Sequence, residues 1–404
     1  NALKTIKDDE VAIVTIGRSG GESSDLPLNT LSTGYRYLQV DDNERDTIKL
    51  ACANFDKVIL IVNTNNPIEL GFLEDVAYQN VKSVLWCGGV GQEGLYGLAS
   101  VIAGTSNPSG KLVDTFAYDS TSAPSFNNMG DFSIANADKN TERANKYLVY
   151  GEGIYVGYRY YETRYEDALL NQGNAGSFNY DSEVQYPFGY GLSYTTFEYS
   201  NFKVSETSDG NSFEITVDVT NTGDVDGKDV IEVYVHKPYN GKIETSAIEL
   251  VGVAKTDVIK SGETVSNVEV TVDKKQLTSY DYKNAKTYVL DAGDYYFSIG
   301  NGSHEALNNI HALLNTPSVS GNASLAKLAF TQEAIDKETF AKSDVTDYTI
   351  TNQFEDADIN KYDDNFKYLS RGNWVSTLAS SSNYQNKSWT APSQLIEDLK
   401  WNRS

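Results

Sequence analysis

The chain has 404 residues, of which 40% are hydrophobic and 22% are charged, as is usual for globular proteins. Its 33 Lys and Arg residues stand against 56 Asp and Glu residues, which gives a net charge of −23 at neutral pH. Phosphate backbones are bound by basic faces, so this balance argues against nucleic acid as a partner. No apolar run approaches the roughly 18 residues that a membrane-spanning helix needs, so no membrane partner is expected.

Metal ions and cofactors are not expected either. His236, His304 and His311 show no metal-ligand spacing, and the sequence holds no cluster of Cys and His residues. Cys52 and Cys87 lie in a predicted helix and a predicted strand, which favours two buried free thiols over a disulfide.

Residues 1–117 form a predicted α/β domain. Strands are predicted at four short, strand-like runs: 11–16, 58–62, 83–86 and 111–116. Helices are predicted where apolar residues recur at helical spacing: 46–53, 69–78 and 93–103. Strands separated by helices of this length indicate βαβ units and a parallel sheet.

Residues 118–195 break this alternation. Ser, Asn, Tyr and Gly dominate the segments 145–161 and 186–194. Their aromatic side chains need burial, so we predict an ordered connector without regular structure, packed against the first domain.

Residues 196–302 change to a period of two. Apolar and polar residues alternate in four clear runs: 213–219, 230–235, 265–272 and 295–299. Turn signals such as Asn240-Gly241 separate these runs. About seven short strands in some 100 residues predict an immunoglobulin-like or fibronectin-III-like β-sandwich.

Residues 303–404 are polar and weakly periodic. The run 325–333 is compatible with a strand or a short helix, and 368–374 is an isolated apolar island. This composition indicates an extended linker that wraps a neighbour.

One loop has the features of a site. GRSGGESSD at 17–25 follows the first predicted strand and carries Glu22. Ligands of open parallel sheets bind at the carboxyl edge of the strands, where this loop belongs. A Glu in a Gly/Ser loop is, however, usually solvated and idle, so the residues alone leave Glu22 open as a reactive carboxylate or a bystander.

Other patterns compete with this interpretation. GVGQEG at 89–94, with Asp114 further on, matches a dinucleotide-binding fingerprint, but the long loop at 104–110 favours a structural glycine turn. Asp114 and Asp119 are further candidate carboxylates, although nothing in their spacing requires a pair. The absence of a G-x-S-x-G motif argues against an α/β-hydrolase.

Several blocks resemble glycoside hydrolase family 3. GQEG at 91–94, NPSGKL at 107–112 and TF at 115–116 resemble its signature. YGEGIYVGYRYY at 150–161 and YPFGYGLSYT at 186–195 resemble two later blocks, the second of which leads into a fibronectin-III-like domain. The blocks keep their order over about 11–300, which argues against the nucleotide-binding alternative.

The resemblance implies a role for Glu22. In this family a six-stranded α/β sandwich domain offers a Glu, from an R-x-S-G-E-x-x-D-like loop, to an active site on a separate (β/α)8 barrel. Arg18, Gly21, Glu22 and Asp25 match that spacing, although Ser19-Gly20 departs slightly from it. Glu22 would then be the general acid/base. Arg18, Ser19 and Asp25 would bind substrate or support the loop.

The barrel and its Asp nucleophile have no match in this sequence, and the first strands of the α/β domain are expected upstream of residue 1. The chain begins Asn1-Ala2 without an initiator Met or a signal peptide, which suggests the interior of a longer polypeptide. QFEDAD at 353–358 and YLSRGNW at 368–374 resemble the connector of domain-rearranged members, in which the barrel follows.

The resemblance thus implies a retaining β-glucosidase whose partners are a β-linked oligosaccharide or glucoside and a (β/α)8 barrel. The barrel would lie on the same polypeptide or on another chain, and a homo-oligomer is left open. A β-xylosidase of the same family, or a non-catalytic carbohydrate-binding or scaffold fragment, is the alternative.

Overall fold

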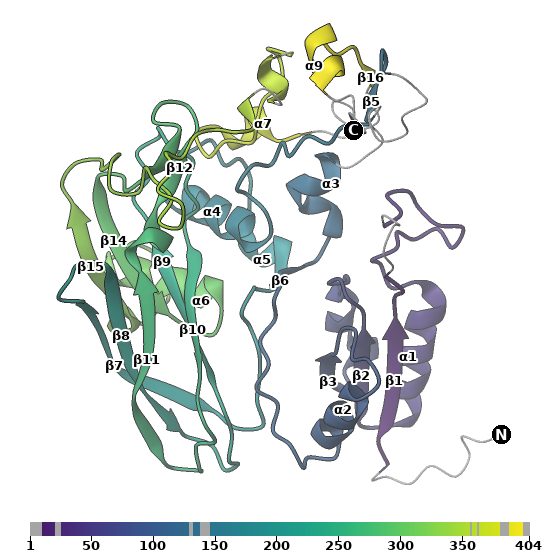
Figure 1. Cartoon of the computed structure of the whole chain (residues 1–404). Coiled ribbons are helices and arrows are strands. Elements are labelled where there is room, and N and C mark those ends of the chain that lie inside the picture. Colours follow the sequence, from purple (N-terminus) through teal and green to yellow (C-terminus); the bar gives the residue numbers. More distant parts are fainter. Residues whose placement is uncertain are drawn as a thin grey trace. The chain divides into compact units, whose positions relative to one another are not determined.

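The computed structural model describes residues 10–20, 26–128, 132–137, 146–355, 358–361, 363–379 and 388–398 (Figure 1). Their contacts divide into two compact units. The first unit falls within 1–108, 114–122 and 181–187, and the second within 109–113, 123–180 and 188–404.

The first unit is built on a parallel three-stranded sheet in the order β1-β2-β3. β1 (Ala12–Gly17), β2 (Val58–Asn63) and β3 (Val81–Trp86) confirm three predicted strands. Val58, Leu60 and Val62 are fully buried in the central strand, which explains its continuous apolar run.

The predicted strand at 111–116 is wrong for most of its length. Only β4 (Phe116–Ala117) pairs, and it pairs antiparallel with β6 (Val184–Tyr186) in a sheet of its own. The backbone of Leu112 instead bonds the backbone of Gly189 and Tyr190. Residue 112 is therefore paired with the segment 188–190 of the second unit.

Two helices of this unit are confirmed, and a third is not α-helical. α1 (Asp42–Asn54) and α2 (Gly94–Ile102) flank the sheet strands in sequence. The predicted helix at 69–78 consists of two 3₁₀ turns, Gly71–Glu74 and Val76–Tyr78. Asp75 is extended between them and accepts a hydrogen bond from the Ala77 amide, so it begins a new turn rather than continuing the old one.

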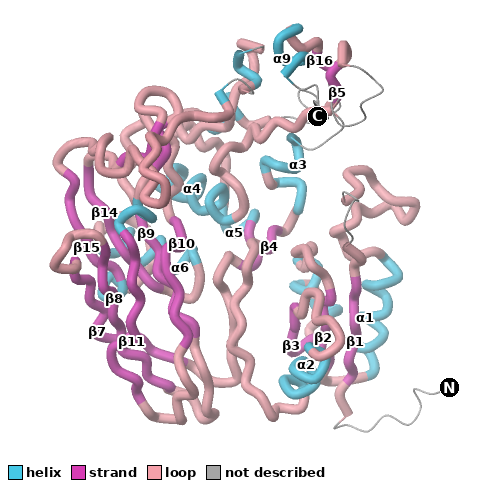
Figure 2. The backbone as a smooth tube through the Cα atoms, in the orientation of Figure 1, coloured by secondary structure: helices cyan, strands magenta, loops and turns pink. Residues whose placement is uncertain are grey.

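The second unit contains the predicted β-sandwich. One sheet has the order β10-β9-β14-β15 and the other β11-β8-β7 (Figure 2). The strand bounds are β7 Phe197–Glu206, β8 Ser212–Asn221, β9 Val230–His236, β10 Glu249–Lys255, β11 Thr264–Asp273, β14 Gly293–Ile299 and β15 Ala326–Gln332. Alternate side chains of both sheets form one core, in which Phe213 lies 5.4 Å from Phe297 and 5.5 Å from Phe330 between ring centroids.

Three longer elements of the second unit differ from the sequence-based expectation. α4 (Tyr158–Leu169) is a regular helix inside the segment predicted to be irregular. β15 pairs with β14 although it follows residue 302, where we predicted the sandwich to end. The third is α6 (Ser303–Leu313), a helix at the start of the predicted extended linker, which packs Ala306, Leu307 and Ile310 against Tyr234 of β9.

The remaining elements are short: α3 (Pro124–Asn128), β5 (Ser133–Ile134), α5 (Tyr180–Glu183), β12 (Ser279–Asp281), β13 (Thr287–Val289), α7 (Trp374–Thr377), β16 (Ser388–Trp389) and α9 (Ser393–Asp398). Among the described residues no helix has the length and apolar character to cross a membrane, and no group of side chains could hold a metal ion. Both cysteines are free thiols, and Cys52 is buried.

Candidate active site

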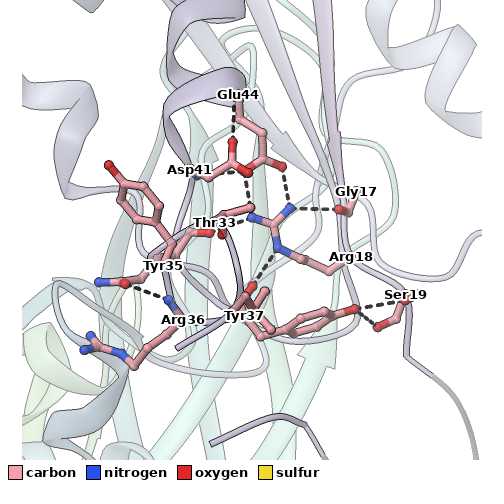
Figure 3. Close-up of a pocket in the computed structure, with 11 residues that line it drawn as sticks. Gly17, Arg18, Ser19, Thr33, Tyr35, Arg36, Tyr37, Asp41 and Glu44 are labelled. Atoms are coloured by element: carbon pink, nitrogen blue, oxygen red, sulfur yellow. Dashed lines mark hydrogen bonds and ion pairs between the residues drawn. The ribbon is translucent and has the colours of Figure 1, made fainter. Parts of the chain in front are cut away.

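Arg18 stands at the carboxyl end of β1, as the first residue of the loop that leads to Glu22. Its amide continues the parallel ladder by bonding the Asn63 carbonyl at 3.2 Å. Its guanidinium donates to the carbonyls of Gly17, Tyr37 and Gln39 at 2.9, 2.7 and 2.6 Å (Figure 3). Two further N–H groups reach the carboxylate of Glu44 at 2.5 and 2.8 Å. A guanidinium has five N–H groups, so every donor of Arg18 is already used within the chain.

Glu44 joins the Arg18 guanidinium to the start of α1. Its Oε2 also accepts the Asp41 amide at 3.0 Å, while the Asp41 side chain accepts the Glu44 amide at 3.0 Å. These reciprocal bonds are a capping box, which satisfies amides at the helix start. The hydrogen bond to Glu44 raises the pKa of Arg18, since it stabilises the charged guanidinium.

Ser19 is held by a second contact. The Tyr37 hydroxyl donates to the Ser19 carbonyl, and the Ser19 and Tyr37 hydroxyls lie 2.9 Å apart. Arg18 and Ser19 are therefore both fixed by residues 37–44 of the same unit (Figure 3).

An open pocket of about 300 Å³ is lined in part by Arg18, Tyr37 and Glu44. Its lining residues are Gly17, Arg18, Ser19, Leu31, Thr33, Tyr35, Arg36, Tyr37, Gln39, Asp41 and Glu44 (Figure 3). A volume of this size suits a small polar ligand. The polar groups that Arg18, Tyr37 and Glu44 bring to it are, however, bonded to one another or to Ser19.

The other predicted members of the site lie outside the described residues. Glu22 and Asp25 fall within 21–25, as does Gly21. The catalytic role of Glu22 and the supporting role of Asp25 stay predictions, whereas the structure shows the surroundings of Arg18 and Ser19.

Asp114 and Asp119 are bound by other groups. Asp114 accepts the Thr115 amide at 2.8 Å, and burial raises its pKa. Asp119 pairs with Arg36 at 2.8 Å and accepts the Thr121 amide and hydroxyl. Arg36 also lines the pocket, so Asp119 is bonded to a residue of the pocket wall. Asp114 is instead bonded to Thr115, which does not line the pocket.

The glycine motif at 89–94 forms a turn before α2. Gly88 and Gly91 have φ values of 52° and 62°, a region that favours glycine. A Cβ on Gly89 would stand 2.9 Å from the Asn65 side chain. These constraints give the glycines a conformational role.

Sequence reasoning missed Tyr37 and Glu44. The spacing Asp41-x-x-Glu44 is a recognisable capping signal and would also have placed the start of α1. Tyr37 has no such signal, because its contact with Ser19 depends on how residues 31–41 fold back.

Comparison with known proteins assigns two domains. Residues 1–158 match the glycosyl hydrolase family 3 C-terminal domain, and residues 229–303 match a fibronectin type III-like domain. The chain belongs to glycoside hydrolase family 3. The α/β domain and the β-sandwich thus confirm the predicted fold class, and the described sheets are open rather than closed into barrels.

Its relatives include named glycosidases. A β-glucosidase of Ruminococcus albus is 34% identical over 307 residues, which are 75% of this chain and 28% of the relative. An exo-α-(1→6)-L-arabinopyranosidase of Bifidobacterium longum is 29% identical over 317 residues, 78% of this chain and 36% of the relative. The crystal structure of a β-glucosidase from Paenibacillus barengoltzii superposes with a TM-score of 0.61 and 30% identity, over 80% of this chain and 31% of that one. This family 3 chain therefore spans about a third of the length of these relatives.

Proposed function

We propose that this chain is part of a retaining glycoside hydrolase of the β-glucosidase type. The enzyme would release terminal non-reducing β-D-glucose from oligosaccharides or aryl glucosides. The observation that carries the proposal is the 34% identity with the Ruminococcus albus β-glucosidase, which extends over three quarters of this chain.

In this proposal Glu22 is the general acid/base. As acid it protonates the glycosidic oxygen while an Asp of a (β/α)8 barrel attacks the anomeric carbon, so the leaving alcohol departs and a glycosyl-enzyme ester forms. As base it then takes a proton from water, which attacks the same carbon and frees the Asp. The barrel would come from the same polypeptide or from another chain.

Arg18 and Ser19 support the loop in this proposal. Every guanidinium donor of Arg18 is bonded to Gly17, Tyr37, Gln39 or Glu44, so none is left for a sugar hydroxyl. Of the two roles left open by the sequence, loop support agrees with these contacts. Asp25 retains both roles.

The sugar is the finer part of the proposal. The arabinopyranosidase relative, which matches 78% of this chain, favours α-L-arabinopyranosides as a second candidate substrate. A β-xyloside is the alternative that the family resemblance implies. Turnover of the three 4-nitrophenyl glycosides by the complete protein separates these cases, and the highest kcat/KM identifies the sugar.

The acid/base role is tested by Glu22→Gln in the complete protein. We expect kcat on an alkyl glucoside to fall by about 10²–10⁴-fold, because its leaving group needs a proton. Cleavage of a 2,4-dinitrophenyl glucoside, whose leaving group needs little acid help, should fall less, and azide should restore turnover by attacking the glycosyl-enzyme without a base. Wild-type kcat for the alkyl glucoside in the variant would refute the assignment.

The division of the active site is tested with the 404-residue chain alone. It should not hydrolyse 4-nitrophenyl β-D-glucoside, because the nucleophile lies elsewhere, and activity would contradict that division. If the complete protein also failed on all three glycosides, the non-catalytic alternative would replace the proposal.

A further inference from the structure

A segment after the sandwich inserts two side chains deep into the second unit. In 369–378, defined here as the docking segment, Arg371 is 1% exposed and Trp374 is fully buried. Gly372, Asn373 and Val375 are exposed between and beside them. Two buried anchors in an exposed segment are the pattern of a bound peptide, in which a few large side chains contribute most of the affinity.

Arg371 is recognised by acidic groups. Its Nε lies 2.9 and 3.1 Å from the carboxylate oxygens of Asp167, and another guanidinium nitrogen donates to Glu166. The third nitrogen donates to the Thr245 carbonyl at 3.1 Å, and the guanidinium stands 4.3 Å from the centroid of the Tyr239 ring. Planar recognition of this kind is specific for Arg over Lys.

Trp374 fills an aromatic recess next to the same carboxylate. Its indole nitrogen donates to Asp167 at 2.7 Å. Its ring meets those of Tyr155 and Tyr160 edge to face, with centroids 4.8 and 5.8 Å apart. Asp167 therefore binds both anchors, so binding depends on the spacing between the Arg and the Trp.

The backbone of the docking segment is fixed as well. The amides of Trp374 and Val375 bond the carbonyls of Gly173 and Asn174 at 2.9 and 3.3 Å, respectively. Glu244 accepts the Arg371 amide at 3.0 Å and the Ser370 hydroxyl at 2.6 Å. We call the recess formed by Tyr155, Glu166, Asp167, Gly173, Glu244 and Thr245 the socket.

The socket contains a buried, ionised carboxylate, that of Glu166. Glu166 also accepts from His236 Nε2 at 2.9 Å, and burial alone would raise its pKa. The charges of His236 and Arg371 outweigh burial and hold the pKa of Glu166 well below its ordinary value. An ionised, buried carboxylate needs cationic partners, and Arg371 of the docking segment is one of them.

We propose that the socket is a peptide-recognition site whose ligand is the docking segment, Arg-x-x-Trp, bound in cis. The long polar stretch between β15 and Arg371 acts as a tether that raises the effective concentration of the ligand. Docking holds the chain against the second unit at Trp374, many residues after the end of β15 in the sequence. The proposal does not depend on the glycosidase activity.

The test uses a vacated socket in the full chain. In the variant Arg371→Ala/Trp374→Ala, a fluorescein-labelled synthetic peptide of residues 366–379 should bind and raise fluorescence anisotropy. Wild type should not bind it, because its socket is occupied. Val375→Ala, at a position that is 53% exposed, is the matched control and should behave as wild type. A peptide with both anchors replaced by Ala should bind the vacated socket at least about tenfold more weakly.

Two outcomes would overturn the proposal: a folded double variant that binds neither peptide, or one that binds both equally. If the double variant does not fold, hydrogen exchange on the wild-type chain decides. The amides of Trp374 and Val375 should exchange faster than those of β8, β9 and β14, through release of the docking segment alone. If all these amides instead exchange at one common rate, that of global unfolding, the segment is part of the core and the proposal is wrong.

Discussion

At the scale of single residues, Arg18 shows how one side chain ties a strand end to a helix start. Its guanidinium and the capping box of α1 share the same Glu44 carboxylate. Loss of either partner leaves half-buried charged groups without their bonds, and hydrogen bonds to charged groups are the strong ones.

We therefore expect Arg18→Lys and Glu44→Gln each to lower the free energy of unfolding of the first unit by about 2 kcal/mol. Lys keeps the charge but lacks the fork that spans both oxygens. The double variant should lose little more unfolding free energy than the less stable single variant. In urea titrations this corresponds to a coupling free energy of about 1–3 kcal/mol between the two side chains. Glu93→Gln, at an exposed position, is the control, and strict additivity would show that Arg18 does not act through Glu44.

Glu232 gives a pH prediction. Burial is the main cause that raises the pKa of this carboxyl to about 7, and the charge of Asp229 also raises it. The hydrogen bond from Tyr234 at 2.7 Å and the charge of Lys111 act in the opposite direction and lower the pKa. The folded state thus binds this proton more tightly than the unfolded state, whose pKa is about 4.5. The resulting stability is complete below the unfolded pKa and is lost as pH rises through 7.

Between pH 4.5 and 8 this loss should approach about 3 kcal/mol. Glu232→Gln keeps the shape without the charge, so the difference between variant and wild type isolates this group from the three histidines. Equal slopes of unfolding free energy against pH in the two proteins would refute the interpretation.

At the scale of elements, two glycines predict opposite effects of the same substitution. Gly252 stands at a bulge in β10, where a Cβ would lie 2.4 Å from Val270 Cγ1 and 3.3 Å from Val272 Cγ2. Gly97 lies inside α2, with open space around its Cβ position.

Gly252→Ala should lower the free energy of unfolding by about 1–3 kcal/mol through overpacking of the sandwich core. Gly97→Ala should raise it by about 1 kcal/mol, because Ala restricts the unfolded chain and favours the helix. Thermal unfolding of both variants checks the two signs, and a stabilised Gly252→Ala protein would show that the bulge can open.

The helices and strands also show what the sequence allows one to predict. β1, β2, β3 and the sandwich strands carry a one-dimensional apolar pattern, so their positions follow from local order. The segment 69–78 has the pattern of a helix, but Asp75 stops it with a capping bond, and α4 lies where Tyr and Gly content suggested irregular structure. Composition does not report which carbonyl or side chain a residue finally bonds.

At the scale of the whole molecule, the family could be predicted from the sequence, because its motifs are ordered blocks rather than single residues. The active site could be predicted only in part. The position of Arg18 at the end of β1 follows from the strand pattern, whereas its partners Tyr37, Gln39 and Glu44 meet it only in the folded state. The sequence shows most of the docking segment as an apolar island at 368–374, but the two carboxylates that bind Arg371, Glu166 and Asp167, lie about 200 residues away in α4.

The seventh sandwich strand has a practical consequence for dissecting this protein. β15 covers the edge of β14, and Phe330 stacks on Tyr295 with ring centroids 4.5 Å apart. A protein truncated at residue 302, where the family match nearly ends, would expose that edge and a row of unpaired amides and carbonyls. Such an edge templates intermolecular strand pairing, so the shortened protein should precipitate, and a soluble sandwich should extend at least to Gln332.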